Sequence, residues 1–85
     1  MYTYYTYYPY GVCSQQIDIC LDGDTIVDVQ FYGGCNGNLK AISTLIRGMK
    51  VDDVAALLEG NTCGPRPTSC ADQLVKGLRA AQATQ

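Results

Sequence analysis

The stretch SQQIDICLDGDTIVDVQFY, residues 14–32, decides the fold of this chain. Apolar and polar residues alternate on both sides of a central Asp-Gly-Asp, and a period of two is typical of strands with one buried face. The Asp-Gly pair is a turn signal. The stretch therefore predicts a β-hairpin with strands over 14–22 and 25–32. The residues expected to face the core are Ile17, Ile19, Leu21, Val27, Val29 and Phe31.

The segment that precedes the hairpin, residues 1–10, is rich in tyrosine and threonine, which favour strands. Pro9 would end such a strand or place it at a sheet edge. We therefore expect residues 1–10 to form an edge strand or to be partly disordered. An alternative interpretation is an aromatic surface that binds a partner or ligand.

The hydrophobic period changes to that of a helix after the Gly- and Asn-rich residues 33–38. Asn38 is a suitable N-cap and Gly48 marks the helix end. The apolar residues expected to share one helix face are Leu39, Ile42, Leu45, Ile46 and Met49.

Two further helices are predicted downstream. The first spans 51–59, with acidic residues in its first turn and Gly60 after its end. The second follows Ser69, an expected N-cap, with Asp72 three residues later in a capping-box-like arrangement. Its predicted buried face consists of Leu74, Val75, Leu78 and Ala81, and residues 82–85 are expected to fray.

This order of elements predicts the fold class. Strands that are followed by helices indicate an α+β domain, with a small antiparallel sheet of about three strands and three helices packed on one face. We expect residues 11–81 to form one domain, because 85 residues provide only a single thin core.

Charge and composition exclude several functions. The formal net charge is −2, and the first 39 residues contain no Lys or Arg, so a nucleic-acid partner is not expected. Histidine is absent, so no His-dependent catalytic arrangement can form, and no catalytic residue is assigned. No apolar run is long enough for a membrane span and the N-terminal segment is unlike a signal peptide, so a cytoplasmic location is expected. Assembly into a homo-oligomer is compatible with the sequence.

The five cysteines are numerous for a chain of this length. Cys20 lies in the middle of a strand on the polar face, which predicts an outward or semi-exposed thiol. Cys13, Cys35, Cys63 and Cys70 instead lie at element ends, and helix N-termini near Cys35 and Cys70 would favour the thiolate form.

These four cysteines predict a shared metal site. In a reducing compartment, recurrent cysteines indicate metal or redox chemistry before structural disulfides. Four sulfurs without histidine fit tetrahedral zinc or an iron–sulfur centre. The spacing C-x21-C-x27-C-x6-C lacks the CxxC pairs of a zinc ribbon, so four unrelated thiols remain the alternative.

Several short motifs carry a resemblance to a known family. They are TSCADQL at 68–74, GVCS at 11–14, GGCNGNL at 33–39, GM at 48–49 and TCG at 62–64. Together they resemble the short, four-cysteine branch of the TSCPD domain family, over residues 10–78. Ala71 stands where the name-giving motif has proline. The resemblance implies that the four cysteines of the family correspond to Cys13, Cys35, Cys63 and Cys70.

The resemblance also implies a functional context. The TSCPD domain occurs at the C-terminus of some bacterial ribonucleotide reductases, so ribonucleotide reductase or another redox protein is an implied partner. The chain is too small to reduce ribonucleotides alone. The order of elements is also similar to U-type iron–sulfur cluster scaffolds, in which three cysteines match Cys13, Cys35 and Cys70.

Three hypotheses follow from the sequence. The chain is a zinc-binding accessory domain, or it is a thiol-redox or sulfur-handling protein that holds a transient cluster. The third hypothesis is a plain interaction domain that uses its tyrosine-rich segment.

Overall fold

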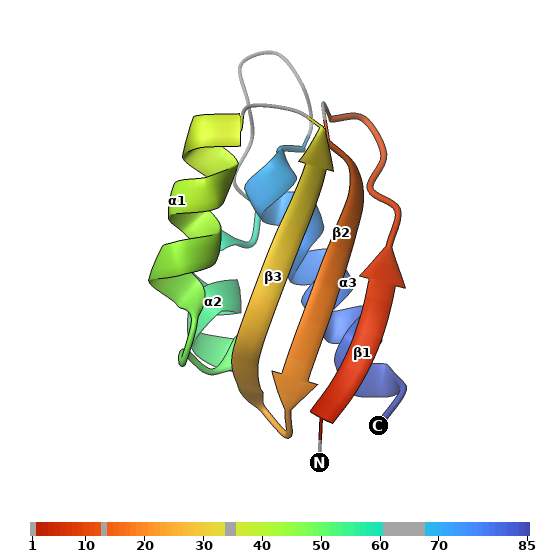
Figure 1. Ribbon diagram of the computed structural model, residues 1–85, viewed down its shortest axis with the longest axis vertical. Coiled ribbons are helices and arrows are strands. Elements are labelled where there is room, and N and C mark those ends of the chain that lie inside the picture. Colours follow the sequence, from red (N-terminus) through yellow and green to blue (C-terminus); the bar gives the residue numbers. More distant parts are fainter. Residues whose placement is uncertain (1, 13, 34–35, 61–67) are drawn as a thin grey trace.

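The computed structural model describes residues 2–12, 14–33, 36–60 and 68–85. Within these residues three strands come first and three helices follow. The strands form one antiparallel sheet in the order β1-β2-β3, and the helices pack against one face of it (Figure 1). This two-layer arrangement confirms the predicted α+β class.

The central hairpin forms where the alternating pattern predicted it. Strand β2 spans Ser14–Asp22 and strand β3 spans Thr25–Gly33. Ile17, Ile19 and Leu21 are all buried, which confirms the predicted inner face of β2.

The inner face of β3 differs from the prediction at its start. The pairing with β2 skips Val27, because Asp28 pairs with Cys20 while Ile26 pairs with the next residue of β2. Such a β-bulge places one extra residue in the strand and disturbs the alternation of faces. Ile26 is therefore fully buried and Val27 is only partly buried, so the prediction that Val27 faces the core with Val29 is wrong.

The tyrosine-rich segment forms the edge strand β1, Tyr2–Tyr7, which ends before Pro9. It pairs with β2 over its whole length, from Tyr2 opposite Asp22 to Tyr7 opposite Ile17. Its side chains alternate between the two sheet faces. Tyr7 packs against the core, whereas Tyr2 is exposed.

Helix α1, Asn36–Ile46, begins earlier than predicted, because Asn38 lies inside its first turn rather than at the cap. The pattern of buried residues does not show at which residue a helix begins. The N–H groups of the first turn have no partner within the helix. Gly48 follows the helix with φ of +85°, which agrees with its predicted role at the helix end. Leu45 is 75% exposed, against prediction, and the main contact of α1 is with β3 at the sheet edge.

Helices α2, Val51–Leu58, and α3, Cys70–Ala83, agree with the predicted positions. The predicted face of α3 is fully buried. Gln82, expected to fray, is helical and donates to Asp24 at 3.4 Å, while Gln85 donates to the carbonyl of Gly23 at 3.0 Å. These two contacts with the hairpin turn explain why the helix continues.

Helix α3 packs very closely under the sheet at Gly77. A Cβ atom at this position would lie 3.0 Å from Cδ1 of Ile19 and 3.1 Å from Cβ of Tyr7. Only glycine therefore allows the helix backbone to come this close to β1 and β2.

The core lies between the inner sheet face and the helices. Burying this apolar surface is the main force that holds the layers together. No helix in the described ranges is both long and apolar enough to span a bilayer. The buried cluster consists of Ile17, Ile19, Leu21, Ile26, Val29, Ile46, Val51, Val54, Leu74, Leu78 and Ala81.

Candidate metal centre

The first turn of α3 places Cys70, the first residue of the helix. Ser69 has an extended backbone, and its hydroxyl oxygen accepts the Asp72 backbone N–H at 3.1 Å. This is the predicted N-cap, and it satisfies one of the N–H groups that a helix start leaves without a partner. The positive end of the helix dipole lies at Cys70.

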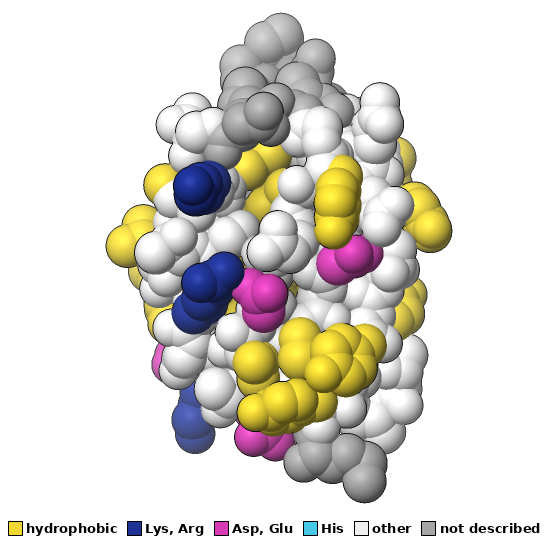
Figure 2. Space-filling model, in the orientation of Figure 1, with side chains coloured by type: hydrophobic (Ala, Val, Ile, Leu, Met, Phe, Trp, Pro, Cys, Tyr) yellow, Lys and Arg dark blue, Asp and Glu magenta, His cyan; other side chains and the backbone are white. Residues whose placement is uncertain are grey.

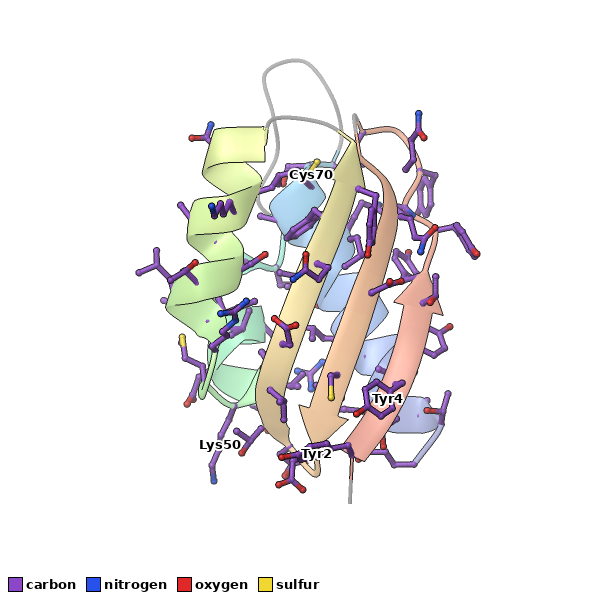
Figure 3. All side chains as sticks on the ribbon, in the orientation of Figure 1. Tyr2, Tyr4, Lys50 and Cys70 are labelled. Carbon is purple, nitrogen blue, oxygen red and sulfur yellow. The ribbon has the colours of Figure 1, made fainter. Side chains whose placement is uncertain are left out.

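Cys70 lies at the end of the sheet where β2 begins. Its Sγ atom is 2.8 Å from Oγ of Ser14, which is 2% exposed. Figure 3 shows Cys70 at this end of the molecule, behind the end of β3. Cys70 is partly exposed as a residue, and the contact with Ser14 fixes the position of its sulfur.

Asp72 joins two separate parts of the chain to the same helical turn. Its buried carboxylate accepts the backbone N–H of Gly60 at 2.8 Å and the hydroxyl of Thr68. Lys76, one turn later, lies 3.9 Å from the same carboxylate. The Thr68 hydroxyl, with help from Gly60 and Lys76, holds the pKa of Asp72 below its ordinary value. The residues on both sides of 61–67 are thereby attached to the start of α3.

Gln73 links this turn to the end of β1. Its side chain is 0% exposed, and its amide N–H donates to Oγ1 of Thr68 at 3.1 Å. Its carbonyl oxygen accepts the hydroxyl of Tyr7 at 3.2 Å and the backbone N–H of Tyr10 at 3.3 Å. Because a buried amide needs partners, these contacts fix the relative position of β1 and α3.

The contacts of Asp72 and Gln73 in this network were not predicted from the sequence. The sequence signal for these contacts is a run of polar residues at the start of a helix whose other buried residues are apolar. Thr68, Ser69 and Asp72 of the TSCADQL motif thus have structural roles beside Cys70: they cap the helix and attach the preceding connection.

The structure places one of the four predicted metal ligands. Cys70 lies at the start of α3, whereas Cys13, Cys35 and Cys63 lie outside the described residues. Among the residues that the structure does describe, no three His, Cys, Asp or Glu side chains form a group that could hold a metal.

Cys20 lies on the outer face of the sheet, as its position in the strand indicates, but it is only 8% exposed. The predicted outward position is therefore confirmed, whereas the alternative of a semi-exposed thiol is wrong. Tyr4 and Asp28 pair with it from the two neighbouring strands, and these longer side chains cover the small one.

Cys20 also lies far from Cys70. Six residues of β2 separate it from Ser14, a distance of about 20 Å along a strand. Figure 3 shows its neighbour Tyr4 toward the opposite end of the sheet from Cys70.

These features define a small α+β domain with a cysteine at the capped start of its last helix. The TSCPD domain family matches residues 2–82, nearly the whole chain, and the chain belongs to this family. The match relates it to the domain associated with ribonucleotide reductase. No curated protein and no solved structure matches the chain.

Proposed function

We propose that the chain is a small metal-binding accessory domain in which Cys13, Cys35, Cys63 and Cys70 hold one zinc ion. The partner that we propose is ribonucleotide reductase or another redox protein of the cytoplasm. In this proposal the domain serves such an enzyme as an accessory, and none of its residues is assigned a catalytic role.

The observation that supports this proposal is the gathering of described residues around the first turn of α3. Ser14, the residue after Cys13, contacts Cys70 directly. Ser14 also pairs with Gly33, which precedes Cys35 by two residues.

The described residues on either side of Cys63 contact the same turn. Gly60 and Thr68, on its two sides, both donate to Asp72. The described neighbours of all three other cysteines thus meet near Cys70, although they are far apart in sequence.

The chemistry of the donor set fits zinc. Four thiolates without histidine form a closed tetrahedral site of the structural type, and such a site contributes directly to folding energy. When bound, the ion would join the hairpin to the last helix and supplement a thin core. The residues themselves position the sulfurs: Ser69 caps the helix that carries Cys70, and Ser14 hydrogen-bonds its sulfur.

Native mass spectrometry with metal analysis tests the proposal and also reports the assembly state. We expect one zinc per chain in the wild type and in Cys20→Ser, and loss of zinc in Cys70→Ser. Cys20→Ser is a matched control because Cys20 lies on the outer face of the sheet, six positions along β2 from Ser14. A wild type that binds no zinc under reducing conditions, or zinc loss in the control alone, would overturn the proposal.

A second candidate is a thiol-redox or cluster-scaffold protein. The observation that favours it is the partial exposure of Cys70 beside a hydroxyl group, because reactive cysteines need access. Alkylation of the native protein separates the two functions. Thiols that hold zinc should resist iodoacetamide until a chelator is added, whereas redox-active thiols should react at once.

A further inference from the structure

None of the described helices packs against the outer face of the sheet (Figure 1). In its middle, cross-strand pairing places outward side chains in two neighbouring rows. One row is Tyr4, Cys20 and Asp28, and the next is Thr6, Asp18 and Gln30. Figure 2 shows this face, with acidic side chains on the sheet and basic ones at one border.

A hollow of about 120 Å³ lies between these rows. Its walls include the ring of Tyr4, which is 76% exposed, and the acidic side chains Asp18 and Asp28. Ile19, Cys20 and Gln30 complete the lining. An aromatic face combined with carboxylates is the chemistry that binds an organic cation.

Asp18 is held in place as an anion. Its Oδ1 atom accepts hydrogen bonds from the hydroxyl of Thr6 and from the amide of Gln16, each at 2.9 Å. The hydrogen bond from Gln16, more than that from Thr6, keeps the pKa of Asp18 below its ordinary value. The carboxylate is therefore charged and oriented before any partner arrives.

Asp28 already binds a guanidinium group of this chain. Arg47 reaches from α1, and its Nε and Nη2 atoms lie 3.1 and 2.8 Å from Oδ1 of Asp28. The N–H of Val29 donates to the same oxygen, so the contacts made by described residues leave the Oδ2 atom open. The face thus accepts arginine at its border, outside the hollow.

The distribution of charge on the chain indicates the sign of the charge that a partner should carry. All six Lys and Arg residues follow residue 39, and the three strands contain none. Apart from Arg47 at the border, no described basic side chain has a recorded contact with the acidic groups of the hollow. A cationic partner is therefore complementary to this face, and an anionic one is repelled.

We propose that the open sheet face docks a partner protein through an arginine side chain, which enters the hollow between Asp18 and Asp28 and stacks on Tyr4. Arginine fits better than lysine because its planar guanidinium both stacks on an aromatic ring and pairs with carboxylates. The proposal is independent of the four proposed metal ligands, Cys13, Cys35, Cys63 and Cys70, and of any metal.

The test is an NMR titration of the ¹⁵N-labelled full chain with a blocked Gly-Arg-Gly tripeptide. We expect the largest amide shifts at Tyr4, Asp18 and Asp28. The matching citrulline peptide, which is neutral but similar in shape, should cause none of them, and the lysine peptide should bind more weakly.

Two variants measure the contribution of the hollow. Asp18→Asn and Tyr4→Ala should each weaken binding about two- to fivefold, which corresponds to the range for one exposed ion pair or cation–π contact. Asp53→Asn, an exposed residue of α2, is the matched control for loss of one charge and should bind like the wild type.

Several outcomes would overturn the proposal. They are an absence of shifts at the hollow, equal binding of the citrulline peptide, equal binding of the lysine peptide, or equal loss in Asp53→Asn. Circular dichroism of each variant establishes that the fold is intact. Because Asp18 and Tyr4 are on the surface, we expect it to be unchanged.

Discussion

The sharpest test of the packing between the two layers is Gly77→Ala. Its methyl group would lie 3.0 Å from Cδ1 of Ile19 and 3.1 Å from Cβ and Cγ of Tyr7. Ile19 can shift the end of its side chain only within a filled core. Tyr7 is held at its backbone by strand pairing and at its hydroxyl by Gln73.

The expected change in the free energy of unfolding follows from two opposed effects. Overpacking of a filled core costs about 1–3 kcal/mol, and the upper part of this range applies because neither neighbour is free to move. Alanine is better than glycine inside a helix by about 1 kcal/mol. We therefore expect Gly77→Ala to lower the free energy of unfolding by about 1–2 kcal/mol, which lowers Tm by roughly 4–16 °C in a domain of this size.

Urea denaturation followed by circular dichroism measures this change. Gly37→Ala is the matched control, because Gly37 lies in the first turn of α1 and a Cβ atom there would meet nothing within 4 Å. It should stabilise the domain by about 0.5 kcal/mol. If Gly77→Ala were as stable as the wild type while the control behaved as expected, α3 and the sheet would not be in the tight contact described above.

Three further predictions concern the site and the outer face. Ser69→Ala should lower the free energy of unfolding by about 1 kcal/mol, because the Asp72 N–H loses its cap, and Ser69→Thr should restore most of it in the same urea titration. Charge on the Cys20 sulfur, followed by partial burial, raises the pKa of Tyr4 above its ordinary 10.0, so Cys20→Ala should lower the Tyr4 pKa in an NMR titration. Because folding raises the Tyr4 pKa, the contribution of Tyr4 to the free energy of unfolding is present below pH 10 and is lost as the pH rises through the pKa of the folded state. An unchanged Tyr4 pKa in Cys20→Ala would contradict the contact between Tyr4 and Cys20. A strong chelator should lower the Tm of the zinc-loaded wild type but leave Cys70→Ser unaffected, and calorimetry with equal shifts in both would argue against a stabilising metal.

Much of the fold was predictable from local patterns. The alternation in 14–32, the helical period after residue 39 and the cap at Ser69 each depend on neighbours in the sequence. Each predicted the right kind of element, although Val27 and Leu45 are not buried as expected. The fold class followed from the order of the strands and helices along the chain. The prediction of Val27 as a core residue was wrong because a bulge depends on how two strands pair, which a single strand does not record.

The candidate site was predictable in part. Cys70 at a helix start was expected, but the attachment of Gly60 and Thr68 to Asp72 was not, since those contacts join residues that no periodicity relates. The four-cysteine set stays a prediction.

The sequence by itself determined which segments are strands and helices, where the last helix begins, and which side chains prefer the core. Only the tertiary structure decided that Cys20 is covered by Tyr4, that Ser14 meets Cys70, and that one sheet face stays open between two carboxylates. The physical reason is that propensity and capping act over a few neighbouring residues. Burial and side-chain contacts instead depend on which distant segments the sheet and the helix layer bring together.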